Sequence, residues 1–151
     1  MTLRRTILSP VGPLTLAEGE GALVGVAFRD DGACDRSPLL DEAERQLTEY
    51  FAGRRREFDL PLAPAGTPFQ REVWDALRTI PYGRTCSYGD IARAVGRPKA
   101  CRAVGMANNR NPLPIVIPCH RVVGASGSLT GYGGGLDIKA MLLKLEGIAI
   151  F

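Results

Sequence analysis

The sequence predicts an α+β protein with a small mixed N-terminal domain, a β-hairpin or sheet plus one helix, followed by a mostly helical C-terminal domain with a helix-turn-helix. Three observations support this class. Alternating apolar residues around a glycine turn in the first third predict a hairpin. A segment rich in proline follows, and the remainder carries helices bracketed by capping signals. We place the domains at residues 1–62 and 63–151.

Composition limits the classes of function. With 151 residues, 45% hydrophobic and 23% charged, the chain is typical of a globular protein. The net charge of +3 permits binding to a polyanion without requiring it. The apolar stretch near the amino terminus is broken by Pro10, Pro13 and Glu18, so no signal-peptide core forms. We therefore expect a cytoplasmic protein without contact to a membrane.

The predicted N-terminal elements show no chemistry. Leu14 and Leu16 alternate with polar or small residues, and after a turn at residues 19–21 a second strand follows over residues 23–28. Ser37 and Pro38 then begin a helix that ends at Gly53. Its expected buried face consists of Leu40, Ala43, Leu47, Tyr50 and Phe51.

Residues 60–66 contain two prolines and a glycine, which predict a linker. The next helix starts with a capping box, in which Thr67 is the N-cap and Gln70 follows three residues later. Pro81 ends it. Its expected buried stripe consists of Phe69, Val73, Leu77 and Ile80.

Two short helices come next. Ser87 and Asp90 cap the first, which stops at Gly96, and Pro98 opens a second that runs to about Ala107. The second helix is rich in small side chains, which permit close approach to a protein core or to a narrow DNA groove. The pair is a candidate helix-turn-helix, and a plain helical corner explains the same pattern.

Residues 114–124 read PIVIPCHRVVG, and an apolar run of this kind predicts a buried strand. It ends in Cys119, His120 and Arg121, and cationic neighbours lower the pKa of a thiol toward the reactive thiolate. Adjacent side chains on a strand point to opposite faces, so His120 can serve Cys119 only if the chain turns at Pro118 or a water relays the proton. The four cysteines form no CxxC pair and His120 is the sole histidine, so we expect no metal site.

The last segment combines a glycine-rich loop with a final helix. Tyr132 lies within the loop over residues 130–135, which a flexible tip also explains. Asp137 is the expected helix cap, and Glu146 precedes the terminating Gly147. The residues expected to point inward are Ile138, Met141, Leu142 and Leu145.

These motifs together resemble the O6-alkylguanine-DNA alkyltransferase (methylated-DNA-protein-cysteine methyltransferase) family. The resemblance covers the second domain in order. Its landmarks are TPFQR at 67–71, SY at 87–88, KACRAVG at 99–105, NP at 111–112, PCHR at 118–121, YGGGL at 132–136 and EG at 146–147.

The resemblance implies stoichiometric, irreversible repair of O6-alkylguanine in DNA, with base flipping, and could extend to O4 of thymine. Cys119 would take the alkyl group, His120 would act as base through a water, and Glu146 would orient His120. Tyr88 would protonate the departing base, and Asn111 would brace the turn before the cysteine. The implied partner is double-stranded DNA containing O6-alkylguanine, the protein is expected to be a monomer, and no cofactor or metal is implied.

The resemblance also implies two sets of contact residues. Arg102 would fill the space left by the extruded base. The full DNA-contacting set is Lys99, Arg102, Ala103, Arg121 and Tyr88, and the base pocket would consist of Tyr132, Gly133, Val122 and Cys119. Gly133 stands where many relatives carry serine, so a side-chain contact to O6 is replaced by the backbone N–H and the pocket should be roomier.

Two other functions remain open at this stage. A lesion-binding relative without chemistry would lack the reactive cysteine, whereas Cys119 is present. A thiol hydrolase would use the Cys119–His120 pair, but no oxyanion-hole motif is recognisable.

Overall fold

The computed structural model describes residues 2–149. The chain divides into two compact units, Met1–Ala65 and Gly66–Phe151. The predicted linker contains this division. Its first part belongs to the N-terminal unit, because Leu62 forms a β-bridge with Leu23.

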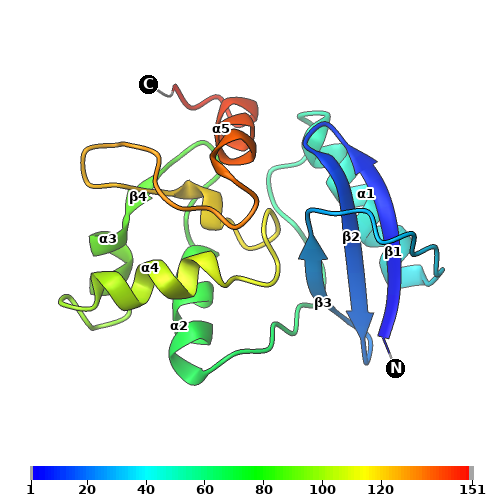
Figure 1. The fold of residues 1–151 in the computed structure, drawn as a ribbon, viewed down its shortest axis with the longest axis horizontal. Coiled ribbons are helices and arrows are strands. Elements are labelled where there is room, and N and C mark those ends of the chain that lie inside the picture. The colour runs from blue at the N-terminus through cyan, green and yellow to red at the C-terminus, as the bar shows by residue number, and fades with distance from the viewer. Residues whose placement is uncertain (1, 150–151) are drawn as a thin grey trace. The chain divides into compact units, whose positions relative to one another are not determined.

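The N-terminal unit is a three-stranded antiparallel sheet with one helix against it (Figure 1). The strands are β1 (Thr2–Ser9), β2 (Gly12–Gly19) and β3 (Ala22–Ala27), in the order β1-β2-β3. The predicted hairpin corresponds to β2 and β3. The sequence analysis missed β1, whose side chains are mostly partly exposed and therefore give weak apolar alternation.

Helix α1 (Pro38–Phe51) confirms the predicted helix in this unit. The Ser37 hydroxyl accepts a hydrogen bond from the backbone N–H of Leu40, which satisfies one of the free donors of the first turn. Leu40, Leu47 and Tyr50 are fully buried. Their burial gives the small sheet an apolar partner.

The C-terminal unit contains four α-helices and two short strands among its described residues (Figure 1). The helices are α2 (Pro68–Leu77), α3 (Tyr88–Ala94), α4 (Cys101–Asn109) and α5 (Leu136–Leu145). Strands β4 (Cys86–Ser87) and β5 (Val122–Val123) pair in parallel. This pairing places the start of α3 beside the segment that follows Cys119.

The capping signals of α2 and α3 are confirmed. Thr67 and Gln70 form a reciprocal capping box at α2, and Ser87 and Asp90 form one at α3. The turn after α3 passes through Gly96 at φ +75°, a left-handed conformation that glycine adopts without strain. Helices α3 and α4 thus form the expected helix-turn-helix pair.

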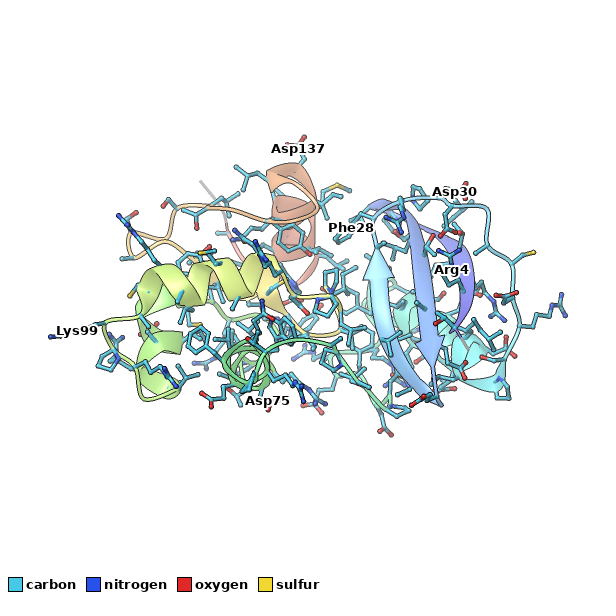
Figure 2. The ribbon with its side chains drawn as sticks, turned by 60° about the horizontal axis from the view of Figure 1, so that its bottom comes forward. Arg4, Phe28, Asp30, Asp75, Lys99 and Asp137 are labelled. Atoms are coloured by element: carbon cyan, nitrogen blue, oxygen red, sulfur yellow. The ribbon has the colours of Figure 1, made fainter. Side chains whose placement is uncertain are left out.

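The ends of α4 and α5 differ from prediction. Helix α4 starts at Cys101 rather than Pro98, without a side-chain cap. Helix α5 starts at Leu136, and its N-cap is Gly135 rather than the predicted Asp137. Asp137 lies exposed in the first turn of the helix (Figure 2). Met141 is 45% exposed, so its predicted burial is wrong. The buried face of α5 is formed by Lys139, Leu142 and Leu143.

Candidate active site

The segment that leads to Cys119 is a series of buried turns, not the predicted strand. The Ile117 N–H donates to the Leu113 carbonyl at 2.8 Å, and the Cys119 N–H donates to the Ile117 carbonyl at 2.7 Å. The second bond closes a tight turn around Pro118, with φ −80° and ψ 64°. The chain therefore turns at Pro118, and Cys119, His120 and Arg121 form one turn of 3-10 helix.

Asn111 holds these turns together. Its side-chain Nδ2 donates to the Ile117 carbonyl at 2.8 Å, and its Oδ1 accepts from the Leu113 N–H at 2.9 Å. Within the segment Ile115 has φ +74°, a strained conformation for a β-branched residue. The side chain of Asn111 also acts on the Cys119 thiol, whose pKa it lowers. Asn111 therefore connects the shape of the turn to the sulfur atom.

His120, Glu146 and Arg121 form a buried ionic cluster. His120 Nε2 lies 2.7 Å from Glu146 Oε2. Arg121 Nε donates to Glu146 Oε1 at 2.8 Å, and its Nη2 donates to Oε2 at 3.0 Å. The side chains of His120 and Glu146 are both fully inaccessible to solvent. The two-point ion pair fixes the carboxylate, which in turn orients the imidazole.

The predicted role of Arg121 in DNA contact requires an exposed side chain. In the structure this side chain is buried. Its side chain is only 7% exposed, and its Nη1 donates to the Ile80 carbonyl at 2.7 Å. Its hydrogen-bond partners, Glu146 and Ile80, are both buried. Arg121 therefore pairs with Glu146 in the interior, and this burial does not support its predicted contact with DNA.

Burial determines the protonation of the reacting pair. Burial raises the pKa of the Cys119 thiol to about 11, more than its hydrogen bonds and the nearby Lys139 lower it. The Cys-His-Arg sequence predicts a lowered pKa for the Cys119 thiol, but in the structure this pKa is raised. Burial also lowers the pKa of His120, more than Glu146 raises it. The resting pair is a neutral thiol and a neutral imidazole.

This arrangement leaves one atom of His120 available as a base. Because the Glu146 carboxylate accepts a hydrogen bond from Nε2 of His120, Nε2 carries the ring proton and Nδ1 keeps its lone pair. Nδ1 is buried and has no hydrogen-bond partner among residues 2–149. It can therefore accept the thiol proton through one water molecule.

Lys139 is a site residue that the sequence analysis missed. Its ammonium donates to the Val122 carbonyl at 2.6 Å and to the Thr130 carbonyl at 2.7 Å. Burial lowers its pKa to about 8, and the favourable partner for its charge is Cys119. The signal was present in the sequence, because Lys139 falls on the same face of α5 as Leu142 and Leu143.

The predicted base-pocket residues gather partly around the sulfur. The Tyr132 side chain acts on the Cys119 thiol, whose pKa it lowers. The carbonyl of Val122, a predicted base-pocket residue, already accepts a hydrogen bond from Lys139. A side chain at Gly133 would meet only the Asn109 carbonyl, at an ordinary 3.5 Å. Gly133 is thus not required by close packing.

The predicted DNA-contacting residues other than Arg121 lie on the helix pair. Arg102 and Ala103 are exposed on α4, whereas Val104 and Ala107 are buried. Lys99 is exposed in the turn before α4 and extends away from it (Figure 2). The outer face of α4 therefore combines small side chains with positive charge.

Two further findings bear on the class of protein. No group of three or more metal-ligating side chains occurs within the described range 2–149. Over the same residues, no helix has both the length and the apolar character needed to cross a membrane.

The fold and site define a protein with a buried cysteine next to a buried His120–Glu146 pair, in a unit that also carries a helix-turn-helix. Residues 3–64 match the family described as "6-O-methylguanine DNA methyltransferase, ribonuclease-like domain", and residues 68–148 match its "DNA binding domain". The chain belongs to the 6-O-methylguanine DNA methyltransferase family.

Individual relatives agree. A methylated-DNA–protein-cysteine methyltransferase of Methanosarcina acetivorans is 54% identical, covering 92% of this chain and 94% of the relative. The Mycobacterium tuberculosis OGT solved in complex with DNA has TM-score 0.87 and 51% identity, covering 95% of this chain and 91% of that one. S. pombe Atl1, solved with damaged DNA containing O6-carboxymethylguanine, has TM-score 0.51 and 35% identity, and covers only 55% of this chain and 79% of its own.

Proposed function

We propose that the protein repairs DNA by direct reversal, transferring a methyl or other alkyl group from O6 of guanine to Cys119. The observation that carries the proposal is the buried Cys119 thiol, which is followed in the chain by His120. Glu146 accepts a hydrogen bond from Nε2 of His120, so the lone pair on Nδ1 is available as a base. The family and its relatives supply the reaction class. The geometry supports the roles proposed for His120 and Glu146.

In the reaction, the Cys119 sulfur attacks the alkyl carbon while the bond from that carbon to O6 breaks. The thiol proton passes to His120 Nδ1, and Glu146 stabilises the resulting imidazolium. Lys139 stabilises negative charge on the sulfur during this step. Tyr88 donates its hydroxyl proton to the departing base. The product is a thioether, which is no leaving group, so each molecule reacts once.

The base must leave the helical stack before it can reach a buried sulfur. Extrusion costs a few kcal/mol, and side chains that occupy the vacated space reduce that cost. Arg102 is exposed on α4 among small side chains, which suits insertion into the narrow minor groove. Lys99 and Ala103 lie beside it and complete the proposed contact surface.

The decisive experiment is single-turnover transfer from duplex DNA containing O6-methylguanine, followed by intact mass and peptide mapping. We expect one methyl on Cys119 per molecule. Cys119→Ala should abolish transfer and keep DNA binding. Transfer beyond one equivalent, or methylation at another residue, contradicts the proposal. DNA binding without transfer by the unmodified protein would identify a lesion-binding protein instead.

Arg102→Ala provides a test of base extrusion. It should slow transfer from duplex DNA much more than transfer from the free base O6-benzylguanine, because only the duplex reaction requires extrusion. The matched control is Arg110→Ala, which removes another exposed arginine next to α4. Equal slowing with both substrates would exclude the role proposed for Arg102.

We also propose that residues 63–151 carry both alkyl transfer and DNA binding, and that the protein acts as a monomer in the cytoplasm. The chemistry supports the first point, because every proposed site residue lies in this range. Fractionation of cells followed by immunoblotting tests the location, and sedimentation with and without DNA tests the oligomeric state.

A further inference from the structure

The hydroxyl of Tyr88 has a specific partner outside the Cys-His-Glu site. Its oxygen lies 2.8 Å from Oγ1 of Thr130, a residue 42 positions further along the chain. The Tyr88 ring faces Gly105 of α4, where an added Cβ would lie 3.8 Å from ring carbon Cδ1. Helix α4 thus limits the position of the ring, and Thr130 fixes its hydroxyl.

Thr130 is itself held in place through its main chain. Its carbonyl accepts a hydrogen bond from Lys139 Nζ at 2.7 Å, and the same ammonium donates to the Val122 carbonyl of β5 at 2.6 Å. Lys139 is fully buried. Thr130 is therefore fixed relative to the segment that carries Cys119, although it belongs to the loop before α5.

The chemistry of two hydroxyl groups determines the direction of their bond during the reaction. A phenol has one proton, and so has a threonine hydroxyl. If the Tyr88 proton goes to the departing base, the bond to Thr130 persists only with Thr130 as donor. This direction points the Tyr88 proton away from Thr130. It also stabilises the charge that develops on the phenolic oxygen, because hydrogen bonds to charged groups are stronger than neutral ones.

We propose that Thr130 is a positioning residue for alkyl transfer, whose hydroxyl orients Tyr88 and makes it a better proton donor by donating a hydrogen bond to its oxygen. The inference rests on the proposed function, in which Tyr88 protonates the base. The S–C bond forms, the C–O6 bond breaks, and the thiol proton goes to His120. The base takes the proton of Tyr88, and Thr130 keeps its own. Proton exchange with solvent then restores His120 and Tyr88.

The test compares Thr130→Val, which keeps the shape but lacks the hydroxyl, with Thr130→Ser, which keeps the hydroxyl. Transfer from duplex O6-methylguanine is measured with saturating protein, so that the rate constant excludes binding. Thr130→Val should slow transfer about tenfold, the value of one hydrogen bond to a charged group. Thr130→Ser should restore most of the rate. In a Tyr88→Phe background, Thr130→Val should cause no further slowing.

A second readout separates proton donation from damage to the thiol site. Alkylation of Cys119 by iodoacetamide expels iodide, which needs no proton, so Thr130→Val should leave this rate unchanged. Thr130→Ala serves in the same assays if the valine variant does not fold. An unchanged transfer rate in the variant, equal slowing in the Tyr88→Phe background, or equal slowing with iodoacetamide would overturn the role of Thr130. Failure of the unmodified protein to methylate Cys119 would instead overturn the proposed function.

Discussion

Burial, rather than neighbouring charge, controls the thiol of Cys119. Its pKa is raised to about 11, so the thiolate fraction and the rate of iodoacetamide labelling should rise about tenfold per pH unit between pH 7 and pH 10. Mass mapping follows Cys119, with the exposed Cys34 as reference for the reagent. A labelling rate that levels off near pH 7 would mean that the thiolate is already formed in the resting protein.

Arg121 should affect stability rather than DNA affinity. Arg121→Met leaves the buried carboxylate of Glu146 without its cation, and loss of one partner from a buried pair lowers the free energy of unfolding by about 3–5 kcal/mol. Chemical denaturation measures this change. The control Arg102→Ala alters an exposed side chain and should change stability by about 0.5 kcal/mol or less. Weaker DNA binding with unchanged stability would restore Arg121 to the DNA-contacting set.

The sequence predicted the identity of the reacting residues better than their surroundings. Cys119, His120 and Glu146 were all proposed, and the structure brings His120 and Glu146 into contact and places Cys119 next to His120 in the chain. The burial of Arg121 was not predicted, and Lys139 was missed. A charged side chain is ordinarily exposed, and no local pattern shows that its partners are a distant carboxylate or carbonyl groups.

At the level of elements, the capping box of α2 gives a direct prediction. Thr67→Ala removes the acceptor for the Gln70 N–H and should lower the free energy of unfolding by about 1 kcal/mol. Thr67→Ser keeps the hydroxyl and should retain most of that stability. Thermal or chemical unfolding of the three proteins provides the measurement. Equal loss in both variants would show that the methyl group, not the cap, is responsible.

Elements with local signals were predicted well, and elements set by distant contacts were not. Helices α1, α2 and α3 each begin at a side chain that accepts a hydrogen bond from the backbone N–H three residues later. The start of each helix can therefore be predicted from a short stretch of sequence. The run that starts at Pro114 predicts a strand because its side chains are apolar. Its actual turns depend on Asn111 and Pro118. Burial alone does not distinguish a strand from a packed turn.

For the whole molecule, repair should reduce stability. Cys119 is only 4% exposed, so an added methyl group overpacks its surroundings, which typically costs about 1–3 kcal/mol. A benzyl group should destabilise more, although the missing side chain at Gly133 leaves some room. Thermal unfolding of the free, methylated and benzylated protein is the measurement. Coincident midpoints, or higher midpoints after alkylation, would contradict the prediction.

Fluorescence of the single tryptophan, Trp74, can report whether overpacking at Cys119 changes the surroundings of α2 and α4. Trp74 on α2 is 2% exposed, and its indole Nε1 donates to the carbonyl of Ala107 in α4 at 2.8 Å. Fluorescence during the same unfolding experiments therefore reports on the helix that carries Arg102. A change in emission upon methylation, before global unfolding, would show that reaction at the sulfur alters the contact between α2 and α4.

The buried ammonium of Lys139 has one more consequence, which follows from counting charges. Arg121 and Glu146 cancel each other, His120 is neutral, and both hydrogen-bond acceptors of Lys139 are uncharged carbonyls. With a protonated thiol the interior therefore holds one excess positive charge. The thiolate gives this ammonium an anionic partner, while the proton that passes to His120 stays within the site. Alkylation removes that partner for good, because a thioether has no anionic form, so the Lys139 ammonium is then left with uncharged carbonyls alone.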